Sequence, residues 1–386
     1  MTRHWPHISL TTCLVAGGLL MAVPQLRAQG PSPAAIADYQ ARLAQYQAAR
    51  GPYEVEAATY WDAIAEKRRL RNAKRRDHLE IVADDYVLTQ PPVYSGPTRP
   101  VDPRAPAEPP PERPDIPVVA DFLQNAAEQF GFVPERPASD LDFKRAYAKA
   151  ALAAGLTRDQ IVGIYIFETG GNGAYDSQAG LVPYRPGARA ISPAIGYNQL
   201  LSTNSVSLLA EHGGRLAGVL RQRTNTLTGN SRLAMERKID ALKRMIAYSR
   251  SVPGRWSEQD RLAKTTAGGY GIHAAVLDID IGPLLQVQKL INSVHFARAK
   301  GYTAPLTGAE LELMNLTGDS TGLDMVTMPQ ALRARVPTAN FFQQQGYERN
   351  PVARRTGVVA NLIADIEDKM NRGVQAQGAR DLAAAF

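Results

Sequence analysis

From about Val118 to its C-terminus, the chain carries helix signals and no clear strand signal. Apolar residues recur at three- and four-residue steps, which is the period of an amphipathic helix. Residues that cap or open helices stand before these stripes: Ser139 or Asp140, the Thr157–Gln160 capping box, Ser231 and Gly282–Pro283. Gly155 suits the end of the first of these helices, and the last helix is expected over residues 356–370. The sequence therefore predicts an all-α fold, with a main helical domain at residues 118–386.

The first residues have the layout of a secretory signal. Arg3 precedes an apolar run at residues 8–23, and the small residue Ala28 follows it. We expect cleavage near Ala28, which makes residues 1–28 a signal peptide and the mature protein exported and periplasmic. The run is short for a bilayer span; an uncleaved N-terminal anchor is the alternative. The only cysteine, Cys13, lies in this run, so the mature chain is expected to have no disulfide or cysteine-ligated metal.

Between the signal and the main domain, the sequence predicts a basic helical segment at residues 29–87 and a proline-rich linker at residues 88–117. Ser32–Pro33 and Gly51–Pro52 each resemble a helix start with proline in the first turn. These residues predict an αα-hairpin or one long interrupted helix. The prolines of the linker lack an amide hydrogen and fix φ, which favours an extended, semi-rigid spacer.

The helical segment ends in a run of basic residues within a chain of formal net charge +7. Such a run favours an anionic partner such as a cell wall or lipid headgroups. The alternative is a solvated helix face, with Glu66 and Asp77 as partial partners. An exported protein is a poor fit for nucleic-acid binding, so no nucleic-acid partner is expected. The residues concerned are Lys67, Arg68, Arg69, Arg71, Lys74, Arg75 and Arg76.

A carboxylate stands at the end of an apolar helix predicted at residues 159–168. Glu168 shares a helix face with Ile161 and Ile164. Burial and the negative end of the helix dipole both disfavour its ionised form, so both raise its pKa. A carboxyl that stays protonated near neutral pH can act as a general acid. The glycines at 170–171 would leave it at the lip of a cleft, whereas a helix-end salt bridge to an arginine is the alternative.

A second motif follows after a loop. Residues 191–203 read I-S-P-A-I-G-Y-N-Q-L-L-S-T. A Glu near a helix end, a variable loop, and then a Gly-x-x-Gln segment before a Ser-Thr helix start resemble the lytic transglycosylases and goose-type lysozymes. Their second motif typically reads G-L-M-Q. The residues in that place here are Gly196, Tyr197, Asn198 and Gln199, and the resemblance implies that they line a sugar cleft beside Glu168.

A third stretch, residues 310–318, is similar to the A-Y-N-x-G motif of the same family. Asn315 matches the family's Asn, which implies a place in the cleft. Met314 replaces the Tyr and Gly318 falls one residue late, so the aromatic contact of this cleft wall is missing from the motif. Tyr347 or Phe342 are alternatives for it. The resemblance spans roughly residues 141–370 and implies a lysozyme-like fold.

The resemblance implies cleavage of peptidoglycan glycan strands. Glu168 would protonate the glycosidic oxygen between N-acetylmuramic acid and N-acetylglucosamine, and the substrate's N-acetyl group and 6-hydroxyl would replace a protein nucleophile. A hydrolase would instead need a second carboxylate to hold water; the loop acids available for this are Asp176, Asp319 and Asp324. The choice between lyase and hydrolase stays open.

No cofactor or metal is expected, because the histidines show no ligand spacing. A non-catalytic exported protein that binds the wall or serves in assembly is the competing function, since it would keep the fold and the cleft while losing catalysis. In a third interpretation the resemblance is accidental and the chain is a structural helical protein, which would place Glu168 and Gln199 far apart.

Overall fold

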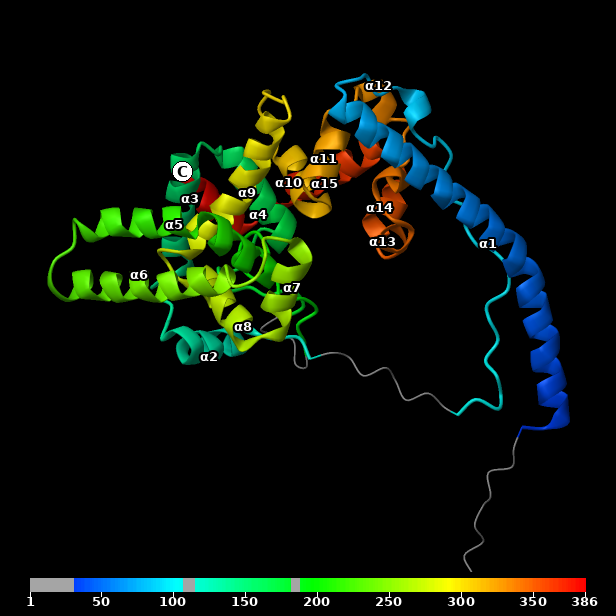
Figure 1. Ribbon diagram of the computed structural model, residues 1–386, viewed down its shortest axis with the longest axis horizontal. Helices are drawn as coiled ribbons and strands as arrows, with labels where there is room; N and C mark the ends of the chain where they lie inside the picture. Colours follow the sequence, from blue (N-terminus) through cyan, green and yellow to red (C-terminus); the bar gives the residue numbers. More distant parts are fainter. Residues whose placement is uncertain (1–30, 107–114, 182–187) are drawn as a thin grey trace, which may run out of the picture. The chain divides into compact units, whose positions relative to one another are not determined.

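The computed structural model describes residues 31–106, 115–181 and 188–386. The described residues form helices joined by turns and loops, and their β-structure is confined to isolated bridges (Figure 1). The predicted all-α class is therefore confirmed. The predicted signal peptide and its cleavage site at Ala28 lie outside the described residues, as do the central prolines of the predicted linker. None of the described helices is long and apolar enough to cross a membrane.

The described residues fall into two compact units. The smaller consists of residues 31–54 and 94–106, and the larger of residues 55–93, 115–181 and 188–386. In the smaller unit the rings of Tyr46 and Tyr53 pack against Tyr94, with centroids 6.2 and 5.2 Å apart. The expected boundary near residue 87 therefore differs from the observed one, because residues 55–93 pack with the main helical domain.

Helix α1 (Pro33–Arg76) continues through Pro52 without a break. Proline has no amide hydrogen to donate to the carbonyl four residues earlier, which belongs to Ala48, but the turns on either side remain helical. The predicted second helix start at Gly51–Pro52 is thus wrong. The helix is a single element rather than a hairpin.

The basic run near the end of α1 belongs to the larger unit and packs against its other segments. Arg71 is only 2% exposed, and its guanidinium donates to the carbonyls of Asp85 at 2.8 Å and Asn340 at 3.0 Å. Other members of the run also bind carbonyl or carboxylate groups of this unit: Lys67, Arg68, Lys74 and Arg75. A solvated face is therefore the wrong interpretation for most of the run. Arg69 and Arg76 remain exposed.

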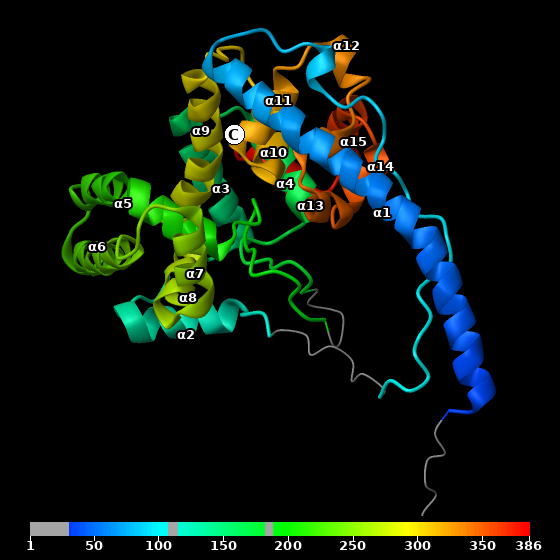
Figure 2. The same ribbon diagram turned by 45° about the vertical axis from the view of Figure 1, so that its right-hand side comes forward.

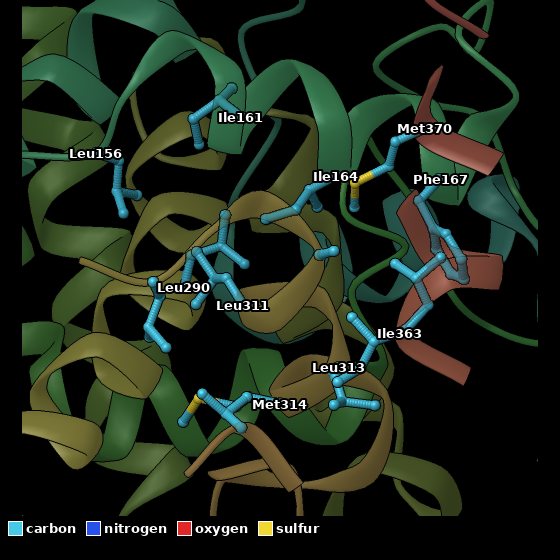
Figure 3. Packing of buried hydrophobic residues seen from close by; sticks show 14 of the residues in the cluster. Leu156, Ile161, Ile164, Phe167, Leu290, Leu311, Leu313, Met314, Ile363 and Met370 are labelled. Atoms are coloured by element: carbon cyan, nitrogen blue, oxygen red, sulfur yellow. The ribbon is translucent and has the colours of Figure 1, made fainter. Parts of the chain in front are cut away.

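The first hydrophobic core of the larger unit forms around α4 (Arg158–Thr169) and α10 (Gly308–Thr317). Figure 3 shows side chains from four helices meeting there: Ile164 of α4, Leu290 of α9, Leu311 of α10 and Ile363 of α15. The neighbouring helices are α3 (Asp140–Ala154), α9 (Gly282–Ala299), α11 (Asp319–Val326), α15 (Val359–Gly373) and α16 (Gln377–Ala384). This packing buries α4 almost completely and leaves its C-terminal end at the border of the core.

The second core forms among α2 (Val119–Phe130), α5 (Ser202–Thr224), α6 (Gly229–Ser249), α7 (Trp256–Thr265) and α8 (Ala267–His273). Helices α5 and α6 run side by side as a hairpin in both ribbon views (Figures 1 and 2). Gly213 of α5 faces Ile246 of α6, where a β-carbon would clash, so glycine permits the close approach. Short helices complete the chain: η1 (Ala83–Asp85), η2 (Ala274–Leu277), α12 (Gln330–Arg333), η3 (Thr338–Phe341), α13 (Gln344–Glu348) and α14 (Pro351–Thr356).

The helix caps predicted from residues close together in the sequence are formed in the structure. Ser139 accepts a hydrogen bond at the start of α3, Gly155 ends that helix in the left-handed conformation, and Thr157 with Gln160 forms the capping box of α4. Helix α6 begins two residues before the predicted Ser231. The helix predicted as the last is α15, and α16 follows it.

Candidate active site

The end of α4 carries Glu168 to the border of the core. The helix ends at Thr169, and Gly170 and Gly171 follow with φ of 68° and 79°. L-residues with a β-carbon rarely adopt this conformation, so the glycines let the chain turn sharply after the helix. The side chain of Glu168 is partly buried, whereas Ile164 and Phe167 before it are core residues.

Helix α10 presents polar side chains to Glu168 from the other side. The amide Nδ2 of Asn315 donates to Oε1 of Glu168 at 3.2 Å. One turn earlier on the same helix lies Glu312, which is fully buried, and the Asn315 Nδ2 lies 3.5 Å from its Oε1. Both carboxyls therefore face one amide. Glu312 was not among the residues predicted from the sequence, although a carboxylate three residues before Asn315 shares its helix face.

Burial controls the charge of this carboxyl pair. Loss of solvation raises the pKa of Glu168 to about 7, against the opposing effects of the neighbouring Glu312 carboxyl and of the positive charge of Lys369. Burial, and then the negative charge of Glu168, raise the pKa of Glu312 well above its usual range. Two neighbouring carboxyls of this kind lose their protons one after the other. Burial therefore favours the neutral form of both carboxyls, and does so for Glu312 in the interior of α10 as well as for Glu168 at the border of the core.

The alternative of a helix-end salt bridge does not fit the geometry. Among the described residues, no arginine forms an ion pair with Glu168. The positive charge that acts on Glu168 is that of Lys369, whose ammonium lies 3.8 Å from the ring centroid of Phe167. Glu168 is thus free of the arginine contact that would lock it in its ionised form.

A cleft of about 760 Å³ opens in front of Glu168. Gln199 and Asn315 line it together with Glu168, so these predicted site residues come together as expected. Further lining residues come from α5, α7, α9, α10 and α11: Asn204, Trp256, Lys289, Leu316 and Asp319. Trp256 was not predicted from the sequence, because the residues around it match no motif.

Gln199 is held in an unusual backbone conformation at the cleft. Its φ is 42°, in the left-handed region that non-glycine residues rarely occupy. Its side-chain Nε2 donates to the carbonyls of Ser177 at 3.1 Å and Gly196 at 2.9 Å. These bonds stabilise the turn and direct the amide oxygen away from the carbonyls that hold the nitrogen. Strained residues of this kind concentrate at functional sites.

The three residues before Gln199 do not line the cleft, contrary to the prediction. Tyr197 is fully buried and its hydroxyl donates to the Asp140 carboxylate at 2.9 Å. Asn198 is 2% exposed, and its backbone amide donates to Oε1 of Gln286 at 3.0 Å. Gly196 is also buried, with φ of 85°, and a β-carbon there would lie 3.0 Å from the same oxygen. These residues anchor the turn beneath the cleft, and Gln199 alone reaches its surface.

Of the loop acids considered for holding water, only Asp319 lines the cleft. Its Oδ1 accepts a hydrogen bond from Ser293 at 2.6 Å. The others form ion pairs elsewhere: Asp176 with Arg136, and Asp324 with Arg75.

The aromatic side chain of the cleft also differs from the expectation. Tyr347 is buried and packs against Trp61 with ring centroids 5.7 Å apart, and Phe342 packs on Tyr347. Neither lines the cleft. Trp256, at the first turn of α7, is 55% exposed and does line it. The exposed aromatic side chain that lines the cleft therefore comes from α7.

Within the described residues, no cluster of His, Asp and Glu side chains has an arrangement that holds a metal ion. The comparisons with protein-family models, curated proteins and solved structures found no match.

Proposed function

We propose that this protein cleaves the glycan strands of peptidoglycan, with Glu168 as the general acid of a lysozyme-like domain. One observation carries the proposal: a carboxyl with a pKa of about 7 lies on the wall of a cleft, beside Gln199 and Asn315. A carboxyl with this pKa is still partly protonated at neutral pH, as a general acid must be. The order of the three motifs supports the same chemistry.

In the proposed reaction, protonated Glu168 gives its proton to the glycosidic oxygen while the bond from that oxygen to the anomeric carbon breaks. Asn315 holds the carboxyl through its 3.2 Å hydrogen bond and stabilises the carboxylate that remains. In a lytic reaction the 6-hydroxyl of the muramic acid then attacks the anomeric carbon and returns a proton to Glu168. In a hydrolytic reaction water attacks instead, and Asp319 is the cleft carboxylate available to accept its proton.

The walls of the cleft suit a chain of sugars. Sugar rings combine apolar faces with hydroxyl and amide edges, and such ligands bind where apolar side chains alternate with a few polar groups. Trp256 and Leu316 supply exposed apolar surface, at 55% and 49% exposure. Asn204 supplies an amide in the same cleft. The amide groups that line it match the N-acetyl groups of the proposed substrate in hydrogen-bonding capacity.

Digestion of purified peptidoglycan tests the proposal. The mature chain, residues 29–386, is compared with Glu168→Gln and with Glu367→Gln as a matched control, because Glu367 is an exposed glutamate on α15. Residues 29–117 are kept, since Arg71 and its neighbours pack on the main domain. Soluble products are identified by mass spectrometry.

We expect products from the wild type and from Glu367→Gln, and none from Glu168→Gln. Anhydro-muropeptides identify a lytic transglycosylase, whereas reducing ends identify a lysozyme. If neither the wild type nor the variants release products and the folded protein still sediments with the wall, the catalytic function is wrong and the protein is a wall-binding one. Equal activity of wild type and Glu168→Gln excludes Glu168 as the acid.

A further inference from the structure

Glu312 is a buried carboxyl that the proposed reaction does not use. Its side chain is fully buried in α10. Among the described residues its Oε2 has no hydrogen-bond partner, and its Oε1 lies 3.5 Å from the Nδ2 of Asn315. An ionised carboxylate with so few donors would carry a large desolvation cost. The geometry therefore favours the neutral acid, which has a hydrogen of its own to donate.

The ionisable groups around Glu312 come from several helices. Glu168 of α4, Lys369 of α15 and the hydroxyl of Tyr147 of α3 interact with it electrostatically. Lys289 of α9 and Asp319 of α11 line the cleft in front of Glu168. The interaction with Glu168 is the strongest of these, and the two carboxyls meet at the amide of Asn315.

We infer that Glu312 is a positioning residue for Glu168: as a neutral acid it donates a hydrogen bond to the Glu168 carboxyl and, together with Asn315, fixes its orientation. The inference rests on the proposed function for its role in catalysis, but the hydrogen bond itself does not depend on a substrate. When Glu168 loses its proton to the leaving oxygen, the donated bond stabilises the new carboxylate without a charged partner. The proton of Glu312 stays on Glu312 throughout.

Two variants separate this role from simple packing. Glu312→Gln keeps the shape and a donor, whereas Glu312→Leu keeps similar volume and removes the donor. In the leucine variant Glu168 loses a hydrogen bond to its charged form, so we expect its titration midpoint to rise by about one pH unit. We expect the glutamine variant to keep the midpoint within a few tenths of a unit and to keep most of the activity. Carbon-13 NMR of glutamate side-chain carboxyls in the mature chain, without substrate, measures the midpoint.

Infrared difference spectroscopy tests the protonated acid directly. At pH 8 we expect a carbonyl stretch of a protonated carboxyl in the wild type and in Glu168→Gln, and its loss in Glu312→Gln. Absence of this band from the wild type, or an unchanged Glu168 midpoint in a folded Glu312→Leu, overturns the inference. If the leucine variant does not fold, the infrared comparison with the glutamine variant still decides. Neither the NMR titration nor the infrared comparison needs a substrate, so their outcome is independent of whether peptidoglycan is cleaved.

Discussion

Asn315 and Glu168 are 147 residues apart in the chain, yet the amide of one donates to the carboxyl of the other over 3.2 Å. The contact joins the last turn of α10 to the last turn of α4 at the border of a core, and both side chains line one cleft. Residues selected from separate motifs thus meet in space.

The pH dependence of wall digestion follows from the state of Glu168. The proposed reaction needs the protonated acid, and its pKa is raised to about 7. We therefore expect the rate to fall above pH 7, by about tenfold per pH unit well above the midpoint. Release of soluble muropeptides, measured from pH 5 to pH 9 at subsaturating wall concentration, checks this. A fall that is already complete by pH 6 would contradict the assigned acid.

Stability should depend on the same group. The folded-state pKa of Glu168 lies above the ordinary value of 4.5, so its contribution to stability is present below pH 4.5 and is lost as the pH rises through about 7. At pH 8 the wild type carries a poorly solvated charge, and we expect Glu168→Gln to be more stable by about 1–3 kcal/mol. Urea unfolding at pH 5 and pH 8 measures this difference. The same stability difference between Glu168→Gln and the wild type at both pH values would contradict the predicted link between stability and the ionisation of Glu168.

Gly196 tests the turn beneath the cleft. Its φ of 85° is unfavourable for alanine, and the added β-carbon would lie 3.0 Å from Oε1 of Gln286. We expect Gly196→Ala to destabilise the protein by about 1–3 kcal/mol. The control is Gly214→Ala, because Gly214 lies inside α5 with open space around it; this change should stabilise by about 0.5–1 kcal/mol. Thermal unfolding compares them, and equal melting temperatures would refute the strain argument.

Sequence patterns predicted the structural features that depend on residues close together in the chain. The caps at Ser139 and Thr157 are formed by residues three positions apart, so they could be read from the sequence. The orientation of residues 196–199 could not, because left-handed residues at both ends of this segment turn successive side chains in directions that no helix or strand period describes. Glu312 was missed for a different reason. Whether a helix carboxylate is solvated or buried depends on the helices that pack over it.

Trp256 tests whether the exposed aromatic of the cleft holds a sugar. It is 55% exposed, so its removal should leave the core intact. We expect Trp256→Ala to weaken glycan binding several-fold, by about 1 kcal/mol or more, and to raise KM more than it lowers kcat. Leu233→Ala is the control, since Leu233 is 51% exposed on α6 and does not line the cleft. Co-sedimentation with peptidoglycan measures binding, and identical binding by the two variants would exclude a contact at Trp256.

The basic run of α1 offers a comparison between neighbouring arginines. Arg71 is 2% exposed, donates to the carbonyls of Asp85 and Asn340, and lies with its guanidinium carbon 4.5 Å from the ring centroid of Tyr86. Arg71→Ala would remove this packing and leave two carbonyls without their donor, so we expect a loss of about 3 kcal/mol or more. Arg69→Ala changes an exposed residue and should alter stability by less than about 0.5 kcal/mol. Urea unfolding distinguishes them. Equal stability would mean that α1 does not hold the larger unit together, whereas a large loss for Arg71→Ala alone would mean that the main domain needs the helix that precedes it.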